Sequence, residues 1–138
     1  MRAFRTLIWI LALVPILTGP LDWSMGLQAP HLIGAQLSQQ DFRDPLLNSQ
    51  IRFFGAIWFG VGLLLILWLL DSARYAIILP GTLGMVFIAG IGRTASIVQF
   101  GLPANAQGMA FVIVTTTLEI VGMPLMLWWY WRLTRSAS

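Results

Sequence analysis

The chain has 138 residues, of which 58% are hydrophobic and 9% are charged, with a formal net charge of +3 at pH 7. Such a composition excludes a soluble globular domain, which needs a charged surface, and it predicts an integral membrane protein. All the basic residues are Arg and they form no basic stripe, so we expect no nucleic-acid partner.

The length leaves room for one domain, residues 1–138, with about four membrane-spanning helices of roughly 20 residues each. The predicted fold class is therefore an all-α membrane protein, a four-helix transmembrane bundle. The chain has no Cys, which excludes disulfides, thiolate chemistry and Cys-ligated metals. We expect no metal and no cofactor.

The first hydrophobic segment covers about residues 4–18 and is predicted to end at Gly19 and Pro20. Arg2 and Arg5 before an apolar core also fit a signal peptide, but no small-x-small cleavage site follows promptly. We therefore expect a short transmembrane helix that Pro15 relaxes in its last turn.

The next segment, residues 22–50, is the one long connection, and we expect it on the outer side. Asp41 to Pro45 predicts a capped turn that leads into the second helix. A short amphipathic helix over Leu32 to Phe42 is a weaker expectation. A lone His rarely ligates a metal, because a site needs three or four ligands, so we interpret His31 as a solvent-facing loop residue.

Three further spans are predicted over about residues 51–70, 75–98 and 109–131. Four spans place both termini on one side of the membrane. More Arg residues fall on that side than on the other, so we expect both termini in the cytoplasm. The Arg residues predicted for the cytoplasmic side are Arg2, Arg5, Arg74, Arg132 and Arg135, against Arg43 and Arg52 outside. Trp128 to Trp131, followed by Arg132, predict an interfacial aromatic belt.

Two ionised residues lie inside the predicted spans, where charges are costly and need a partner or a function. At 1.5 Å per residue, Arg93 lies roughly 8 Å below the outer end of its helix and Glu119 about 15 Å down the next one, so the two can pair. Ser96 shares a helix face with Arg93, while Thr115 and Thr116 share one with Glu119. Our candidate ligand-binding residues are Arg52, Arg93, Ser96, Thr115 and Glu119.

Two further features concern packing around that site. Pro124 removes a backbone donor and frees the carbonyl of Ile120, which predicts an extra acceptor and a bend. Small residues spaced by four predict close helix packing, at Ala56 with Gly60 and at Gly92 with Ser96.

Several stretches resemble a bacterial membrane family known as domain of unknown function 4345. They are LALVPILTG at 11–19, NSQIRFFGAIWFGVGLLL at 48–65, AGIGRTASIVQFGLP at 89–103 and LEIVGMPLML at 118–127. The resemblance implies a bacterial inner (plasma) membrane protein similar to DoxX-like four-helix proteins, some of which are linked to quinone-connected redox complexes. Relatives often carry an acidic residue just before Ile51 and Arg52, where this chain has Gln50.

Three functional interpretations remain open. In the first, Arg52 and Arg93, with Glu119 as counter-charge, bind a small anionic or polar-headed lipophilic ligand, such as a lipid or a quinone-like molecule. In the second, the protein is a non-catalytic accessory subunit of a larger membrane complex, or forms a homo-oligomer. In the third, Glu119 serves an enzyme or a proton-coupled transporter. No nucleophile–base pair is visible in the sequence, which weighs against an enzyme.

Overall fold

The computed structural model describes residues 2–135, and within that range every regular element is helical. Four long helical segments are long and apolar enough to cross a membrane, which confirms the predicted fold class. Three are single helices: α1 (Arg2–Met25), α4 (Pro45–Leu70) and α5 (Ile78–Phe100). The fourth is a continuous run of α6 (Ala106–Thr117), the π-helix η1 (Leu118–Gly122) and α7 (Met123–Arg135).

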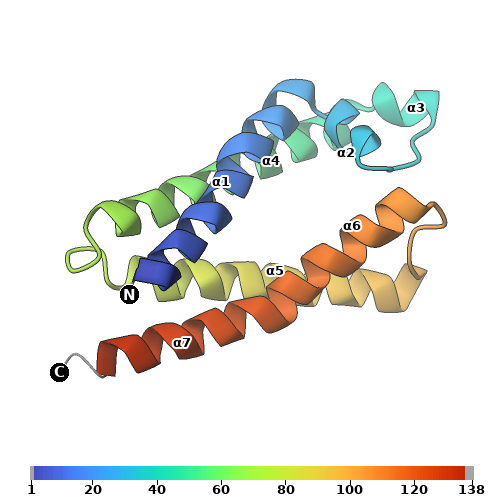
Figure 1. Ribbon diagram of the computed structural model, residues 1–138. Helices are drawn as coiled ribbons and strands as arrows, with labels where there is room; N and C mark the ends of the chain where they lie inside the picture. Colours follow the sequence, from blue (N-terminus) through green and yellow to red (C-terminus); the bar gives the residue numbers. More distant parts are fainter. Residues whose placement is uncertain (1, 136–138) are drawn as a thin grey trace.

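The helices form two antiparallel pairs. Figure 1 shows α1 beside α4, and α5 beside the run from α6 to α7. The start of α1, the end of α7 and the α4–α5 connection lie at one end, and the two pairs diverge toward the other end (Figure 1). Both ends of the described chain are therefore on the same side of the bundle. We call this side the inner end and the opposite side the outer end.

The hydrophobic core lies at the inner end, where the two pairs meet. Phe4 is fully buried there and its ring packs against Trp68, Trp129 and Tyr130 at centroid distances of 6.0, 5.3 and 6.0 Å. The other core residues come from all four spans: Ile8, Ala12, Val61, Leu65, Leu69, Leu79, Leu83, Val86, Met123 and Met126. The burial of this cluster joins the two pairs.

The predicted aromatic belt is present only in part. Trp128 and Trp131 are more than half exposed, as interfacial residues should be, and Arg132 lies over the Trp128 ring at 4.6 Å. Tyr130 instead is buried against Phe4, so the prediction is wrong for that residue. The helical period explains the difference, because successive residues point to different faces.

The first two spans are longer than predicted. Helix α1 does not end at Gly19 and Pro20, but continues to Met25 with Pro15 and Pro20 inside it. Each Pro removes only one donor, and helix remains the favoured state in an apolar environment because it satisfies most backbone groups internally. Helix α4 starts at Pro45 rather than Ile51, because the Asp44 side chain caps it by accepting bonds from the backbone N–H groups of Leu46 and Leu47.

The glycines that allow close packing also differ from the predicted pairs. An added Cβ at Gly55 would lie 2.6 Å from the Trp23 nitrogen, so α1 and α4 are in backbone contact there. Gly60 and Gly92, in contrast, have no atom within 4 Å of an added Cβ. The expectation that these two glycines support packing within the chain is therefore wrong.

The connection between α1 and α4 contains two short helices, α2 (Gln28–Leu32) and α3 (Gln39–Phe42). Of the helix expected over Leu32 to Phe42, only Leu32, at the end of α2, and the last four residues, in α3, are helical. Gly34 has φ +98°, a left-handed conformation that a right-handed helix cannot contain, and this interrupts it. Ser38 and Asp41 then start α3 with a reciprocal capping box.

The remaining boundaries shift by a few residues. Residues 71–77 form turns, so α5 starts at Ile78 rather than Tyr75 and ends at Phe100, before Gly101 with φ +81°. Asn105 caps the fourth span, because its side chain accepts from Gly108 N–H. That span therefore extends beyond the predicted 109–131 at both ends.

Candidate functional site

Arg93 of α5 and Glu119 of η1 form a two-pronged ion pair. Nε of Arg93 donates to Oε2 of Glu119 at 2.9 Å, and Nη2 donates to Oε1 at 3.1 Å. The predicted pairing of these two residues is confirmed. Parallel donation to both carboxylate oxygens is the geometry in which Arg binds a carboxylate most strongly.

The two partners differ in how far they are buried. The side chain of Glu119 is 10% exposed, whereas that of Arg93 is 34% exposed. Both carboxylate oxygens are used, but Nη1 of Arg93 donates to no protein atom. The pair is thus electrically balanced, and one guanidinium nitrogen remains without a protein acceptor.

Close contact between the helices brings the charges together. Gly90 lies on α5 one turn before Arg93, and an added Cβ there would be 2.6 Å from Cβ of Glu119. Only a residue without a side chain permits this approach. Gly90 is not in either of the small-residue pairs that were predicted from the sequence.

Glu119 lies inside the π-helix η1, which the sequence analysis did not predict. The backbone N–H of Met123 donates to the carbonyl of Leu118, five residues back. Pro124 follows Met123 directly. Its missing backbone N–H was the one sequence signal for an irregular helix here, and it was interpreted as a bend. A π-turn inserts one extra residue into the helix and so changes which face Glu119 presents.

The threonines before Glu119 are not equivalent. Thr115 and Thr117 hydroxyls donate to the carbonyls of Phe111 and Ile113, each at 2.8 Å. The Thr116 hydroxyl is buried and has no hydrogen-bond partner. A buried polar group of this kind costs about 1–3 kcal/mol, and Trp68 Nε1 in the core is a second such atom among the described residues.

The other predicted site residues lie outside this pair. Thr115 uses its hydroxyl within its own helix, and Ser96 is exposed, with no hydrogen bond to Arg93 or Glu119. Thr116, which the sequence analysis mentioned only as a neighbour of Glu119, has the more informative environment.

Along the bundle, Arg93 lies beyond the core. Val86 is the last core residue of α5, and Arg93 follows it by two turns, or about 10 Å. This is the half of the molecule in which the helix pairs diverge (Figure 1). The guanidinium also lies over the Phe111 ring at 5.7 Å, which gives it a flat apolar surface on one side.

Arg52 lies apart from the Arg93–Glu119 pair. It is exposed near the start of α4, and its Nη1 donates to the carbonyls of Trp23 and Ser24, both at 2.7 Å. These carbonyls end α1, so Arg52 acts as a cationic cap at the negative end of that helix. The cavity that Arg52 lines, of about 460 Å³, does not include Arg93 or Glu119.

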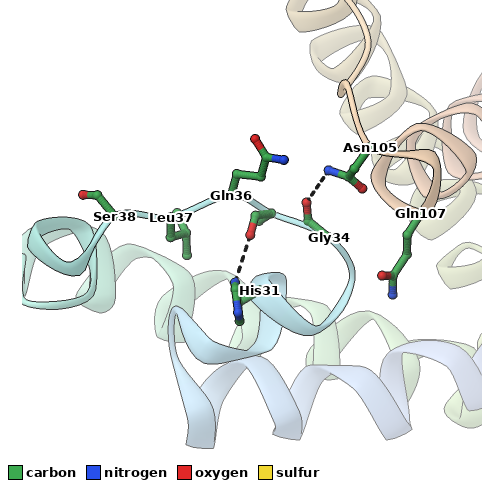
Figure 2. A pocket seen from close by; sticks show the side chains of 8 residues that line it. His31, Gly34, Gln36, Leu37, Ser38, Asn105 and Gln107 are labelled. Carbon is green, nitrogen blue, oxygen red and sulfur yellow. Dashed lines mark hydrogen bonds between the residues drawn. The ribbon is translucent and has the colours of Figure 1, made fainter.

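His31 lies in α2 and is exposed, and its Nδ1 is 3.0 Å from the carbonyl oxygen of Ala35 (Figure 2). It lines a second outer cavity of about 620 Å³ between the α2–α3 segment and the start of α6. Asn105 crosses this gap, donating to the Gly34 carbonyl at 2.8 Å (Figure 2), and Gln107 donates to the Leu32 carbonyl at 2.8 Å. These bonds tie the two helix pairs together at the outer end.

Within residues 2–135, no three His, Asp or Glu side chains gather in a way that would hold a metal ion. The chemistry available at the Arg93–Glu119 pair is therefore that of a balanced ion pair with spare donors.

Comparison with known proteins identifies one family. The family model described as "Domain of unknown function (DUF4345)" matches residues 3–130. No curated protein and no solved structure matches the chain.

Proposed function

Because the chain belongs to the DUF4345 family, whose description assigns no activity, we propose its function from the geometry of the Arg93–Glu119 pair. We infer that the protein is a binding module for a lipophilic ligand whose head group accepts a hydrogen bond. A quinone-like carbonyl and the ester carbonyl of a lipid are such groups.

One observation carries the proposal: Arg93 is paired with Glu119 through two nitrogens, yet a third of its side chain stays accessible in the outer half of the bundle. In an apolar setting a guanidinium donor without an acceptor is costly, so an acceptor at Nη1 would be stabilising. The unbonded Nη1 donor therefore suits the head group of an incoming ligand.

The charge balance of the Arg93–Glu119 pair favours a neutral ligand. Glu119 already compensates the guanidinium, so an anionic head group would add an uncompensated charge in an apolar setting. A neutral acceptor avoids that cost. The buried, unpartnered hydroxyl of Thr116 offers a further donor one helical turn from Glu119.

The arrangement favours binding over proton transfer. Both oxygens of Glu119 accept bonds from Arg93, so the carboxylate has a fixed cationic partner. A proton-carrying role needs that partner to leave. We therefore favour a binding module over an enzyme or a proton-coupled transporter.

A second candidate role, an accessory subunit, has its own observation. Gly81, Gly84 and Gly92 lie on one face of α5, and an added Cβ at each meets no atom within 4 Å. Such a surface allows another membrane helix to approach closely. A homo-oligomer or a larger membrane complex would use it in the same way.

The test for the binding role is extraction of the full chain in native lipid, followed by mass spectrometry of the bound small molecules. We place the protein in the bacterial plasma membrane, so a bacterial host supplies the candidates. We expect one neutral amphiphile to be enriched over bulk lipid. Thr116→Val should deplete it several-fold, since Val keeps the shape and removes the hydroxyl.

Thr115→Val is the matched control, because that hydroxyl is already bonded to the Phe111 carbonyl. It should leave the amphiphile in place. Bulk lipid composition in the wild type, with no change in either variant, would contradict the binding module and leave the accessory role. Recovery of a stoichiometric second protein, lost in Gly84→Leu, would support that role directly.

A further inference from the structure

The cavity at Arg52, which the Arg93–Glu119 proposal does not use, carries a second inference. It lies at the outer end of the bundle, between the end of α1, the short helices α2 and α3 and the start of α4. Its eight lining residues are Met25, Leu27, Gln28, His31, Gln39, Phe42, Asn48 and Arg52, around a volume of about 460 Å³.

Arg52 is the one formal charge among these lining residues. Its Nη1 is held by two backbone carbonyls at 2.7 Å, which fixes the guanidinium plane. Nε and Nη2 donate to no protein acceptor, and Gly26 lies beside them, since an added Cβ there would be 3.2 and 3.4 Å away. The fixed guanidinium therefore pre-organises this edge of the fork. That edge has the geometry that binds two oxygens of a phosphate.

Nearby carboxylates do not occupy this edge. The acidic residues of this region, Asp22, Asp41 and Asp44, are absent from the cavity lining. Asp44 accepts from the N–H groups that start α4, and Asp41 accepts from Ser38 N–H at 2.7 Å. Asp41 and Asp44 are therefore engaged in caps, whereas Asp22 packs beside Gly55 and accepts no bond from Arg52.

The rest of the lining suits the region next to a phosphate. Gln28 and Gln39 add amide donors at the rim, whereas Met25, Leu27 and Phe42 make part of the wall apolar. Phe53 and Phe54, which follow Arg52 on α4 but do not line the cavity, are 58% and 59% exposed. We expect the acyl chains of a lipid held at Arg52 to meet these rings.

We propose that this cavity binds the phosphate group of a phospholipid at the outer surface of the membrane. Arg52 is the cationic side chain that holds the phosphate. The same contacts would accept free inorganic phosphate, and the apolar wall favours the lipid. This inference is independent of the proposed function, because the cavity contains neither Arg93 nor Glu119.

The experiment uses the purified full chain in a non-ionic detergent. Native mass spectrometry measures the binding of phosphatidylglycerol and of diacylglycerol, which lacks the phosphate, with identical acyl chains. A charge-assisted hydrogen bond of about 1.5–3 kcal/mol predicts a preference of roughly tenfold or more for the anionic lipid. Arg52→Gln should abolish the preference.

Arg52→Gln also removes a cap from α1, so a second variant leaves that cap intact. Gln39→Glu adds a carboxylate to the cavity lining, where it competes with phosphate for Arg52. Gln40→Glu is the matched control, since it adds the same charge to α3 one residue on, outside the lining. We expect Gln39→Glu to lose the preference and Gln40→Glu to keep it.

Equal binding of the two lipids by the wild type, or an unchanged preference in Gln39→Glu, would overturn the proposal. Displacement of the anionic lipid by millimolar phosphate would support the site and assign its ligand as the free anion. Glu119→Gln should retain the lipid preference, which separates failure of this site from failure of the intramembrane one.

Discussion

Gly90 and Glu119 touch across the contact between α5 and η1, where an added Cβ on Gly90 would lie 2.6 Å from Cβ and 3.3 Å from the carbonyl carbon of Glu119. Both are atoms close to the helix axis, which cannot move without moving the helix. The distance between the two helices is therefore set at the residue that carries the intramembrane carboxylate. The ion pair depends on this contact, because Arg93 lies one turn along the same helix.

Gly90→Ala should destabilise the protein by about 1–3 kcal/mol, as over-packing of a tight contact does. Gly92→Ala is the control, since an added Cβ there meets nothing within 4 Å. That substitution should be neutral or stabilising by up to about 1 kcal/mol, because Ala is the better helix former. Thermal unfolding of both variants in the same detergent makes the comparison. Equal losses would contradict the contact.

The ion pair itself predicts a positive coupling energy. Glu119→Gln and Arg93→Met should each lower stability, by roughly 1–3 kcal/mol, because each leaves a charge without its partner. The double variant should lose less than the sum of the two. We expect a coupling on the order of 1 kcal/mol, in line with polar pairs inside membranes. Reversible unfolding in mixed micelles measures all three, and strictly additive losses would show that the pair contributes nothing.

The sequence predicts the pair but not its setting. Helical rise and the cost of buried charge were enough to predict that Arg93 and Glu119 can pair. The π-turn around Glu119 lies directly before the core residue Met123 and Pro124, and hydrophobic periodicity does not reveal it. Nor does the sequence distinguish Thr116, whose buried hydroxyl has no partner, from Thr115, whose hydroxyl is bonded within its helix.

At the outer end, local sequence patterns predict some helix caps but not the contacts between distant segments. The capped turn predicted over Asp41 to Pro45 agrees with the start of α4 at Pro45, whereas the apolar run alone predicted a start at Ile51. The bond from Asn105 to Gly34 joins residues 71 positions apart. No local pattern predicts such a contact, and Gly34 was not singled out, although its positive φ ends the helix expected there.

Asn105 has two separable roles, and this gives a test of the outer contact. Its Oδ1 caps α6 through Gly108 N–H at 2.7 Å, while its Nδ2 donates to the Gly34 carbonyl. Asn105→Asp keeps the cap, since Asp is an equally good N-cap, but removes the donor and places a charge against a carbonyl. Residues 33–38 should therefore exchange amide hydrogens faster, by roughly fivefold for a loss of about 1 kcal/mol.

Hydrogen-exchange mass spectrometry resolves that segment from the core. Gln99→Glu, on the exposed side of α5, is the charge control and should leave residues 33–38 unchanged. If Asn105→Asp exchanges like the wild type, the bond to Gly34 does not hold the two helix pairs together.

The inner end of the bundle is predicted to face the cytoplasm. Arg5 donates to the Leu69 carbonyl and to Ser72 Oγ, so it lies at the end of α4 together with the turn that contains Arg74. With Arg2, Arg132 and Arg135 at the same end, most of the positive charge is on this side, as the positive-inside rule requires. Arg43 and Arg52 are at the opposite end.

The chain has no Cys, so single cysteines report the orientation without background. Ala3→Cys marks the inner end and Ser49→Cys the outer end, and both positions are exposed. On intact cells, a membrane-impermeant maleimide should label Ser49→Cys only, and permeabilised cells should show both. Labelling of Ala3→Cys in intact cells would invert the topology. The Arg52 cavity would then face the cytoplasmic leaflet, and its phosphate ligand would have to come from that side.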